Sequence, residues 1–253
     1  MACAVVVFGL EAGDGLRYSG DGRVNVQPLV SVIVPVYNEE KTLHEVLSRL
    51  ERLVERLNLE IIVVDDGSTD GTERIARSFQ LVTLVSHGRN LGKGAAIATG
   101  LRRSRGKVIV VQDADLEYRP EEIPRIVQPI LEHAGDVVYG SRFLGECEGM
   151  SGSHRIGNLI LSLSASVLFQ RRITDVMTGH KAFRRGAIEP LSLDEQGFAI
   201  EVELTGKLAR NGCKFVEVPI RYRYRRKGLS KITFKDGFAC LFTMLRSRFL
   251  DGQ

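Results

Sequence analysis

Carboxylates follow directly on a short apolar run in the middle of the chain. Asp113 and Asp115 come after the run Val108–Gln112, and Glu117 stands two residues further on. Mg²⁺ and Mn²⁺ prefer hard oxygen ligands, and Mg²⁺ takes one or two carboxylates before waters and substrate phosphates complete its shell. The pattern therefore predicts a divalent-cation site that could neutralise a departing diphosphate. A solvated acidic turn or a helix cap is the alternative for so short a motif.

A second acidic pair ends another apolar run. Asp65 and Asp66 follow Ile61–Val64, and the segment Gly67–Gly71 can turn the chain and cap a following helix. A carboxylate at this place could accept hydrogen bonds from a base or a ribose. The same residues are also compatible with a βα turn that binds nothing.

The segment Gly88–Gly94 resembles a phosphate-binding loop but departs from the Walker pattern. It has three residues rather than four between its outer glycines, and no Ser or Thr follows Lys93. A Walker-type ATPase is therefore excluded. Lys93, beside glycines at a helix start, could still bring a point charge to a phosphate or ribose, and a flexible solvated turn is the equal alternative.

Cationic residues form a further group of candidates. Arg142 and Arg155 stand alone, whereas Arg225–Lys231 is a basic run that includes Gly228 and Ser230. Such runs are usually solvated, but Gly and Ser here favour a loop that closes over phosphates, with Arg as a bidentate donor and Lys as a point charge.

The elements around these residues predict how they are positioned. Apolar runs alternate with helix-like stretches, which indicates a mainly parallel sheet with helices on both faces. In such sheets ligands bind at the carboxyl ends of the strands, and that is where the polar motifs 37–39, 65–68 and 113–115 fall. The expected strands are Val30–Val36, Ile61–Val64, Val82–Ser86, Val108–Gln112 and Phe215–Ile220, and the expected helices are 40–57, 72–79, 94–103, 154–169, 200–210 and 234–250.

Two of these helices raise the question of a lipid surface. The stretch Phe234–Leu250 mixes large apolar residues with Lys235, Arg246 and Arg248, as an interfacial helix could. For a helix in a globular domain we instead expect the apolar face to pack on the core. We expect the same of Leu159–Phe169 and of Met177.

The composition limits the classes of protein to which the chain can belong. The 253 residues carry 43% apolar residues and a net charge of +4, which is typical of a globular protein and too weakly basic for a dedicated nucleic-acid binder. Scattered cysteines predict reduced thiols in a cytoplasmic protein.

Residues 1–28 have no continuing periodicity, so we expect an extension followed by one domain, 29–253. We expect neither a signal peptide nor a stretch of membrane-spanning length.

Five ordered motifs resemble glycosyltransferase family 2, and within it the dolichol-phosphate mannose or glucose synthases. They are the segments 34–39, 64–72, 90–94, 113–117 and 140–143, and the likeness extends over Val30–Phe249 through 174–183, 197–201 and 225–231. The resemblance implies a GT-A (Rossmann-like) α/β fold, Mg²⁺ or Mn²⁺, and inverting transfer of a hexose from GDP-mannose or UDP-glucose to a polyprenyl phosphate at the cytoplasmic membrane face, where a membrane protein could be a partner.

The resemblance also implies roles for individual residues. The donor nucleotide sugar would be held by Pro35, Tyr37, Glu39, Asp65, Asp66, Lys93 and Asp113, and the metal by Asp113, Asp115 and Glu117. The family often has Gln at the position of Glu117. The donor diphosphate and acceptor phosphate would meet Arg142, Arg155, Arg225, Ser230 and Lys231, so that catalysis would rest on Asp113, Asp115, Arg142, Arg225 and Lys231.

The acceptor decides whether a base is needed. A phosphate monoester is already nucleophilic at neutral pH, because its second pKa is near 6. A soluble hydroxyl acceptor remains an alternative, and it would need a base, for which Asp175, Glu201 and Glu203 are candidates. A nucleotide-binding module without turnover is an alternative of another class. A nucleotidyltransferase should have a Gly-rich loop after the first strand, where this chain has Pro35–Glu39.

Overall fold

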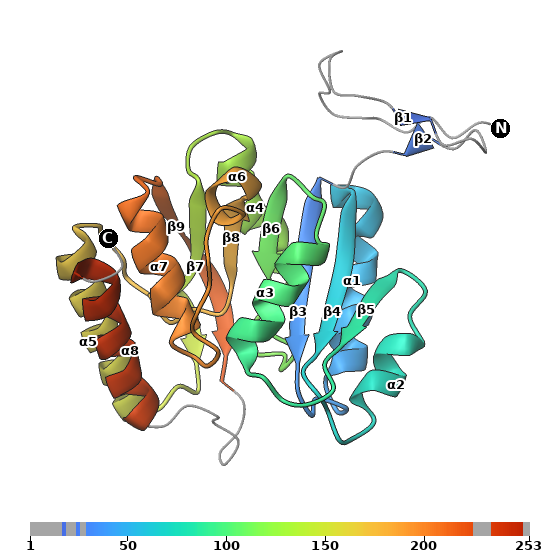
Figure 1. Cartoon of the computed structure of the whole chain (residues 1–253), viewed down its shortest axis with the longest axis horizontal. Coiled ribbons are helices and arrows are strands. Elements are labelled where there is room, and N and C mark those ends of the chain that lie inside the picture. Colours follow the sequence, from blue (N-terminus) through green and yellow to red (C-terminus); the bar gives the residue numbers. More distant parts are fainter. Residues whose placement is uncertain (1–16, 19–23, 26–28, 225–233, 250–253) are drawn as a thin grey trace.

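The centre of the molecule is a seven-stranded sheet (Figure 1). The computed structural model describes residues 17–18, 24–25, 29–224 and 234–249. The strand order is β5-β4-β3-β6-β8-β7-β9. The strands are β3 (Val30–Val36), β4 (Leu59–Asp65), β5 (Val82–Ser86), β6 (Val108–Val111), β7 (Val137–Glu148), β8 (Lys181–Arg184) and β9 (Phe215–Arg223).

The sheet is parallel except at one strand. β3 pairs in parallel with β4 and β6, and β4 with β5, whereas β8 runs antiparallel to both of its neighbours, β6 and β7. The prediction of a mainly parallel sheet is confirmed. β7 and β8 were not predicted; β8 is only four residues long and carries a charge at each end, so it has no apolar run that would indicate a strand.

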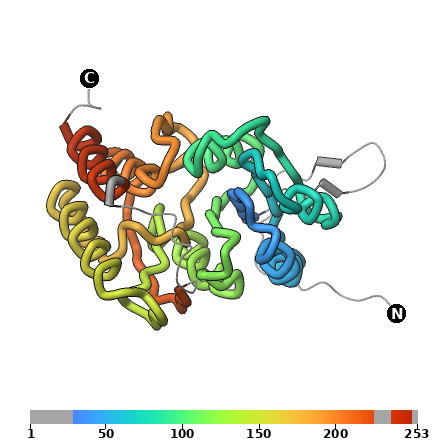
Figure 2. Tube along the Cα trace, turned by 90° about the horizontal axis from the view of Figure 1, so that it is seen from below, coloured from blue at the N-terminus to red at the C-terminus, as the bar shows by residue number. Residues whose placement is uncertain are grey.

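Helices cover both faces of the sheet (Figure 2). α1 and α4 pack on one face and α3 on the other, while α5, α7 and α8 contact one another beside β7 and β9. The helices are α1 (Leu43–Leu57), α2 (Thr72–Arg77), α3 (Lys93–Arg103), α4 (Ile123–Leu131), α5 (Gly152–Phe169), α6 (Arg185–Ile188), α7 (Ile200–Arg210) and α8 (Phe234–Phe249), with a 3₁₀ turn at Pro120–Glu122.

Alternating side chains of the strands build two apolar clusters. Val30, Val32 and Val34 of β3 join the cluster beneath α1 and α4, whereas Ile33 joins the one beneath α3 and α7. All four are completely buried. Because the strand is covered on both faces, its sequence is a nearly continuous run of Val and Ile, which is why its bounds could be predicted.

α5 and α8 differ from the prediction that their apolar residues pack on the core. On α5, Ala165 and Phe169 are buried, but Leu163 is 66% and Val167 69% exposed. The prediction is therefore wrong for the outer faces of both helices. The exposed residues, which we call the α5–α8 apolar surface, are Ile156, Leu159, Ile160, Leu163, Val167, Phe238, Phe242, Leu245 and Phe249.

The described residues before β3 include two short strands. β1 (Arg17–Tyr18) pairs with β2 (Val24–Asn25) and with no strand of the seven-stranded sheet.

Within the described ranges, no helix combines the length and the apolar character needed to cross a bilayer. Of the four cysteines, Cys147, Cys213 and Cys240 are free thiols, and Cys3 lies outside the described residues.

Candidate active site

A cavity of about 520 Å³ opens at the carboxyl ends of the parallel strands. β3, β4 and β6 all end at this edge, and Arg142 and Glu201 from the second half of the chain line the same cavity. The predicted site residues that line the cavity are Pro35, Tyr37, Glu39, Asp66, Lys93, Asp113, Asp115, Glu117 and Arg142.

The loops after β3 and β4 are joined by side-chain hydrogen bonds. Asn38, which has a left-handed φ of 55°, accepts the backbone N–H of Thr69 at 2.8 Å, and its own N–H donates to Ser68 at 3.0 Å. Tyr37 is thereby presented at the cavity and is 37% exposed. A partly exposed aromatic ring beside a cavity is suited to pack against a planar base.

The neighbours Asp65 and Asp66 have different roles. Asp65 accepts hydrogen bonds from the Ser68 N–H and hydroxyl, does not line the cavity, and so shapes the βα turn. Asp66 lines the cavity and accepts the backbone N–H groups of Leu91 and Gly92 at 2.9 and 2.7 Å. Its carboxylate therefore holds the loop that leads to Lys93, and His87 contacts it from the side.

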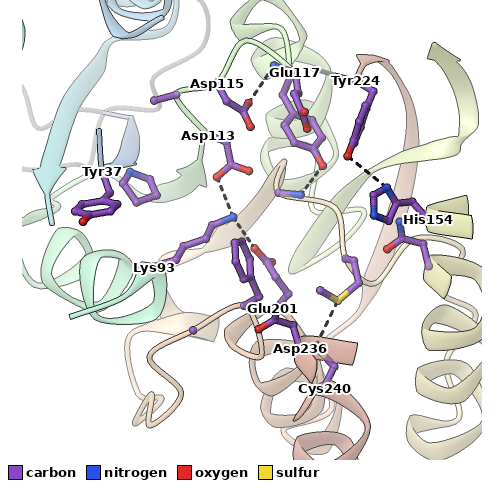
Figure 3. A pocket seen from close by; sticks show the side chains of 18 of the residues that line it. Tyr37, Lys93, Asp113, Asp115, Glu117, His154, Glu201, Tyr224, Asp236 and Cys240 are labelled. Carbon is purple, nitrogen blue, oxygen red and sulfur yellow. Dashed lines mark hydrogen bonds and ion pairs between the residues drawn. The ribbon is translucent and has the colours of Figure 1, made fainter. Parts of the chain in front are cut away.

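The turn after β6 presents the predicted metal carboxylates. Asp113 packs so closely against Gly179 that a Cβ there would lie 2.0 Å from Asp113 Oδ2. Glu117 donates its N–H to Asp115 at 3.0 Å, and its carboxylate accepts the hydroxyl of Tyr222 at 2.5 Å. Asp113 and Asp115 thus face one cavity from a single short turn (Figure 3).

Lys93 joins two carboxylates across the cavity wall (Figure 3). Its ammonium lies 2.8 Å from Asp113 Oδ1 and 2.9 Å from Glu201 Oε1, and the other oxygen of Glu201 is paired with buried Lys181. Burial alone would lower the pKa of Lys93, but Asp113 and Glu201 outweigh it and raise the pKa. These four alternating charges are called the Lys93 quartet below.

Arg142 is held by a buried carboxylate. Its Nε and Nη2 donate to the two oxygens of Asp175, each at 2.7 Å, and Asp175 is fully buried. The guanidinium carbon also lies 5.1 Å from the centre of the Tyr222 ring. Such bidentate, stacked geometry fixes the plane of the guanidinium at the cavity wall.

The three candidate bases differ in whether they reach the cavity. Asp175 is engaged by Arg142, and buried Glu203 pairs with Lys207; neither lines the cavity. Glu201 does line it. Burial would raise the pKa of Glu201, but Lys181 and Lys93 outweigh that effect and lower it to about 2, so Glu201 is a weak proton acceptor.

Some predicted residues are not brought to the cavity. Arg155 is exposed on α5 and is not among the lining residues, and Asp65 is likewise outside the lining. Arg225, Ser230 and Lys231 lie outside the described residues. The prediction that the basic run meets phosphates therefore stays a prediction.

Several lining residues were missed from the sequence. Tyr222 and Tyr224 alternate at the end of β9, and His154 from α5 lies 3.3 Å from the Tyr224 hydroxyl. The alternation in Arg221–Tyr224 was an available signal of one aromatic face. The remaining missed residues that carry polar or sulfur groups are Tyr118, Met150, Ser153, Asn158, Met177, Asp236 and Cys240.

The carboxylate oxygens in the cavity suit a cation that takes the rest of its coordination shell from other molecules. Among the described residues, no three His, Cys, Asp or Glu side chains are grouped so that they could hold a metal ion by themselves. Asp113 and Asp115 nevertheless offer hard oxygens in one cavity. Two carboxylates match Mg²⁺ or Mn²⁺ when substrate phosphates and waters supply the other ligands.

Comparison of the sequence with known proteins finds relatives whose names describe related enzymes. The chain is 33% identical over 239 residues to "Dolichol-phosphate mannosyltransferase" of Pyrococcus furiosus, covering 88% of this chain and 65% of the relative, so it spans about two thirds of that protein. It is 31% identical to "Polyprenol monophosphomannose synthase" of Mycolicibacterium smegmatis, with 87% of this chain and 88% of the relative covered.

Solved structures agree on the fold. Glucosyl-3-phosphoglycerate synthase from Mycobacterium tuberculosis, in a complex with Mn²⁺ and UDP, has a TM-score of 0.69 at 22% identity, over 88% of this chain and 80% of that one. The α/β fold with its mainly parallel sheet is thus the GT-A fold of such glycosyltransferases. The profile of "Glycosyl transferase family 2" matches residues 31–191, and the chain belongs to this glycosyltransferase family.

Proposed function

We propose that the protein transfers a hexose, with inversion, from a nucleoside diphosphate sugar to a polyprenyl phosphate, and that the reaction depends on Mg²⁺ or Mn²⁺. The observation that carries this proposal is the meeting of Asp113, Asp115, Lys93 and Arg142 around one cavity. Carboxylates for a cation and two cationic side chains are what a departing diphosphate requires. Named relatives that use polyprenyl phosphates support the acceptor class.

The donor would lie across the strand ends. Tyr37 and Pro35 would contact the base, and Asp66 would position the loop beneath the ribose and phosphates. Asp113 and Asp115 would hold the cation, which supplies positive charge to the leaving diphosphate. Arg142 and Lys93 would stabilise the same charge as the bond from the anomeric carbon to the diphosphate breaks.

The acceptor phosphate would need no protein base. One of its oxygens forms the new bond to the anomeric carbon, and the electron pair of the broken bond leaves with the nucleoside diphosphate. The cavity supports this choice, because its carboxylate candidate for a base, Glu201, is held ionised by two lysines. A hydroxyl acceptor would find no well-placed proton acceptor among the three that we considered.

The lipid part of the acceptor has a matching surface. α5 contributes His154, Asn158 and Leu161 to the cavity, and α8 contributes Gly237 and Cys240. The same two helices expose the α5–α8 apolar surface on their outer faces. An isoprenoid chain could therefore continue from the cavity along apolar side chains, or remain in a bilayer on which these helices rest.

Release of nucleoside diphosphate tests the proposal. Purified protein would be incubated with Mn²⁺ or Mg²⁺ and GDP-mannose, UDP-glucose or UDP-N-acetylglucosamine, with and without a short polyprenyl phosphate. We expect release that requires the lipid phosphate and that falls roughly 100-fold or more in Asp115→Asn. Asp194→Asn is the matched control, because Asp194 is exposed and lies outside the cavity.

The possible outcomes test the assignment of the acceptor independently of the assignment of the donor. Release that occurs only with a soluble sugar or hydroxyl compound would contradict the lipid acceptor and retain the donor chemistry. Metal-dependent binding of a donor without release toward any acceptor would favour a nucleotide-binding module.

A further inference from the structure

The Lys93 quartet balances its own charges. Two lysines and two carboxylates alternate in the order Asp113, Lys93, Glu201, Lys181, with Lys93 in contact with both acids. The cation beside Asp113 is thus a side chain of the protein itself (Figure 3). Asp113 is also the residue that we assign to the divalent cation.

We propose that Lys93 acts as a stand-in for the divalent cation in the donor-free enzyme, and that its release from Asp113 couples cation binding to diphosphate binding. This inference rests on the proposed function, because it assumes the cation site at Asp113 and Asp115. It assigns Lys93 a role before the donor arrives, in addition to contact with the donor phosphates.

Charge explains the coupling. A divalent cation that enters beside Asp113 meets the ammonium of Lys93, which lies 2.8 Å from an oxygen of that carboxylate. Like charges this close in a partly dehydrated cavity repel strongly. A nucleoside diphosphate brings negative charge to both cations, so it relieves the repulsion, and each ligand then strengthens the binding of the other by the same factor.

The two lysines differ in their freedom to move. Lys181 is 1% exposed, and its ammonium donates to the carbonyl oxygens of Val176 and Thr178 as well as to Glu201. The Lys93 side chain is 17% exposed and faces the cavity. Lys181 therefore continues to neutralise Glu201 when Lys93 leaves Asp113, which lowers the cost of that movement.

The backbone at Lys93 is fixed, so the movement belongs to the side chain. The Gly94 N–H donates to the Gln196 carbonyl at 2.8 Å, and Asp66 holds the Gly92 N–H at 2.7 Å. A Cβ at Gly94 would lie 1.9 Å from the Glu195 carbonyl oxygen. The loop is thus clamped on both sides of Lys93, while the flexible stem of the lysine can swing from Asp113 toward a phosphate.

Mn²⁺ binding without turnover tests this inference. The dissociation constant of Mn²⁺ would be measured by electron paramagnetic resonance, with and without UDP or GDP, for the wild type, Lys93→Met, Lys93→Arg and Lys214→Met. Met keeps the apolar stem and removes the charge, Arg keeps the charge, and exposed Lys214 is the matched control. Circular dichroism would establish that each variant is folded.

We expect Lys93→Met to bind Mn²⁺ alone at least about tenfold more tightly than the wild type, because a competing charge is gone. The strengthening of Mn²⁺ binding by the nucleotide should shrink in the same variant. Lys93→Arg and Lys214→Met should stay close to the wild type in the absence of nucleotide.

Each contrary result has a distinct meaning. Unchanged Mn²⁺ affinity of Lys93→Met without nucleotide would overturn the inference and leave Lys93 as a ligand of the donor alone. If Lys93→Met does not fold, the wild type still decides, since equal Mn²⁺ affinity with and without nucleotide would overturn the coupling. Mn²⁺ binding that is absent from the wild type even when the nucleotide is present, or that survives Asp115→Asn, would contradict the proposed cation site itself.

Discussion

Asp175 holds Arg142 through two parallel hydrogen bonds from the guanidinium and a third from the Arg142 backbone N–H, at 2.7, 2.7 and 3.0 Å. The Asp175 side chain is 0% exposed and that of Arg142 is 7% exposed. A carboxylate hidden below the cavity thus determines how a cationic group is presented within it.

Asp175→Asn should destabilise the protein by about 3 kcal/mol or more, because it leaves the buried charge of Arg142 without its counter-ion. Urea unfolding measures the free energy of unfolding. The matched control is Glu73→Gln, which breaks the exposed pair with Arg77 and should cost less than about 0.5 kcal/mol. Equal effects of the two variants would contradict a structural role for the buried pair.

The substitution Gly92→Ala should lower both the stability of the protein and its affinity for the nucleotide. Gly92 has φ of 95°, and an added Cβ would lie 2.2 Å from the Gln196 carbonyl oxygen. We expect a loss of stability of roughly 2 kcal/mol together with weaker binding of the nucleotide, because the loop carries Lys93. Gly88→Ala, in the same loop, has no atom within 4 Å of the added Cβ and should change little. Thermal unfolding and nucleotide titration would compare the two.

Stability should fall as the pH drops below neutrality because of His180. This side chain is fully buried, its two ring nitrogens have no hydrogen-bond partner among the described residues, and burial lowers its pKa from 6.5 to about 3. The unfolded chain therefore binds the proton first, so the stabilisation is complete above pH 6.5 and is lost progressively toward pH 3.

Between pH 7 and pH 5 we expect a loss of about 2 kcal/mol in the free energy of unfolding. Urea unfolding at the two pH values should show a smaller loss for His180→Leu than for the wild type. His133→Asn, at an exposed position, should retain the wild-type dependence. The same pH dependence in His180→Leu and in the wild type would exclude His180 as its cause.

The α5–α8 apolar surface should bind anionic lipid vesicles. Phe238 is 75% and Phe242 65% exposed, and α8 also carries Arg246 and Arg248 in its last turn. The double variant Phe238→Asp with Phe242→Asp should reduce co-sedimentation with vesicles by at least about tenfold, because two aromatic rings no longer enter the interface. Leu81→Asp changes an apolar residue that is 56% exposed elsewhere and should bind as the wild type does. Co-sedimentation that the double variant retains would contradict this use of the surface.

Elements with a strong local pattern could be predicted closely. The strands Val30–Val36 and Val82–Ser86 and the helix Ile200–Arg210 have the same bounds in the sequence prediction and in the structure. Each is either a short run rich in β-branched residues or a longer stretch with helical spacing of its apolar residues. The positions of Asp66 and Asp113 at the cavity follow from the same logic, since parallel strands end at one edge.

What the sequence did not reveal depends on contacts between distant segments. The partner of Arg142 comes from the loop before β8, a strand whose four residues have no diagnostic period. α5 carries apolar residues on its outer as well as its inner face, so apolar content alone could not separate Phe169 from Val167. Asp65 and Asp66 are adjacent in sequence, and only the fold determines which of them reaches the cavity.

The Lys93–Glu201 pair has a consequence for how the protein is made. Lys93 and Asp113 belong to the half of the chain that leaves the ribosome first, whereas Glu201 lies on α7, after β7 and β8. Strands β3 to β6 can assemble during synthesis, but the charges of the site are balanced only once α7 has docked. Maturation of the active site is therefore expected as a late event in folding, after the sheet on the donor side has formed.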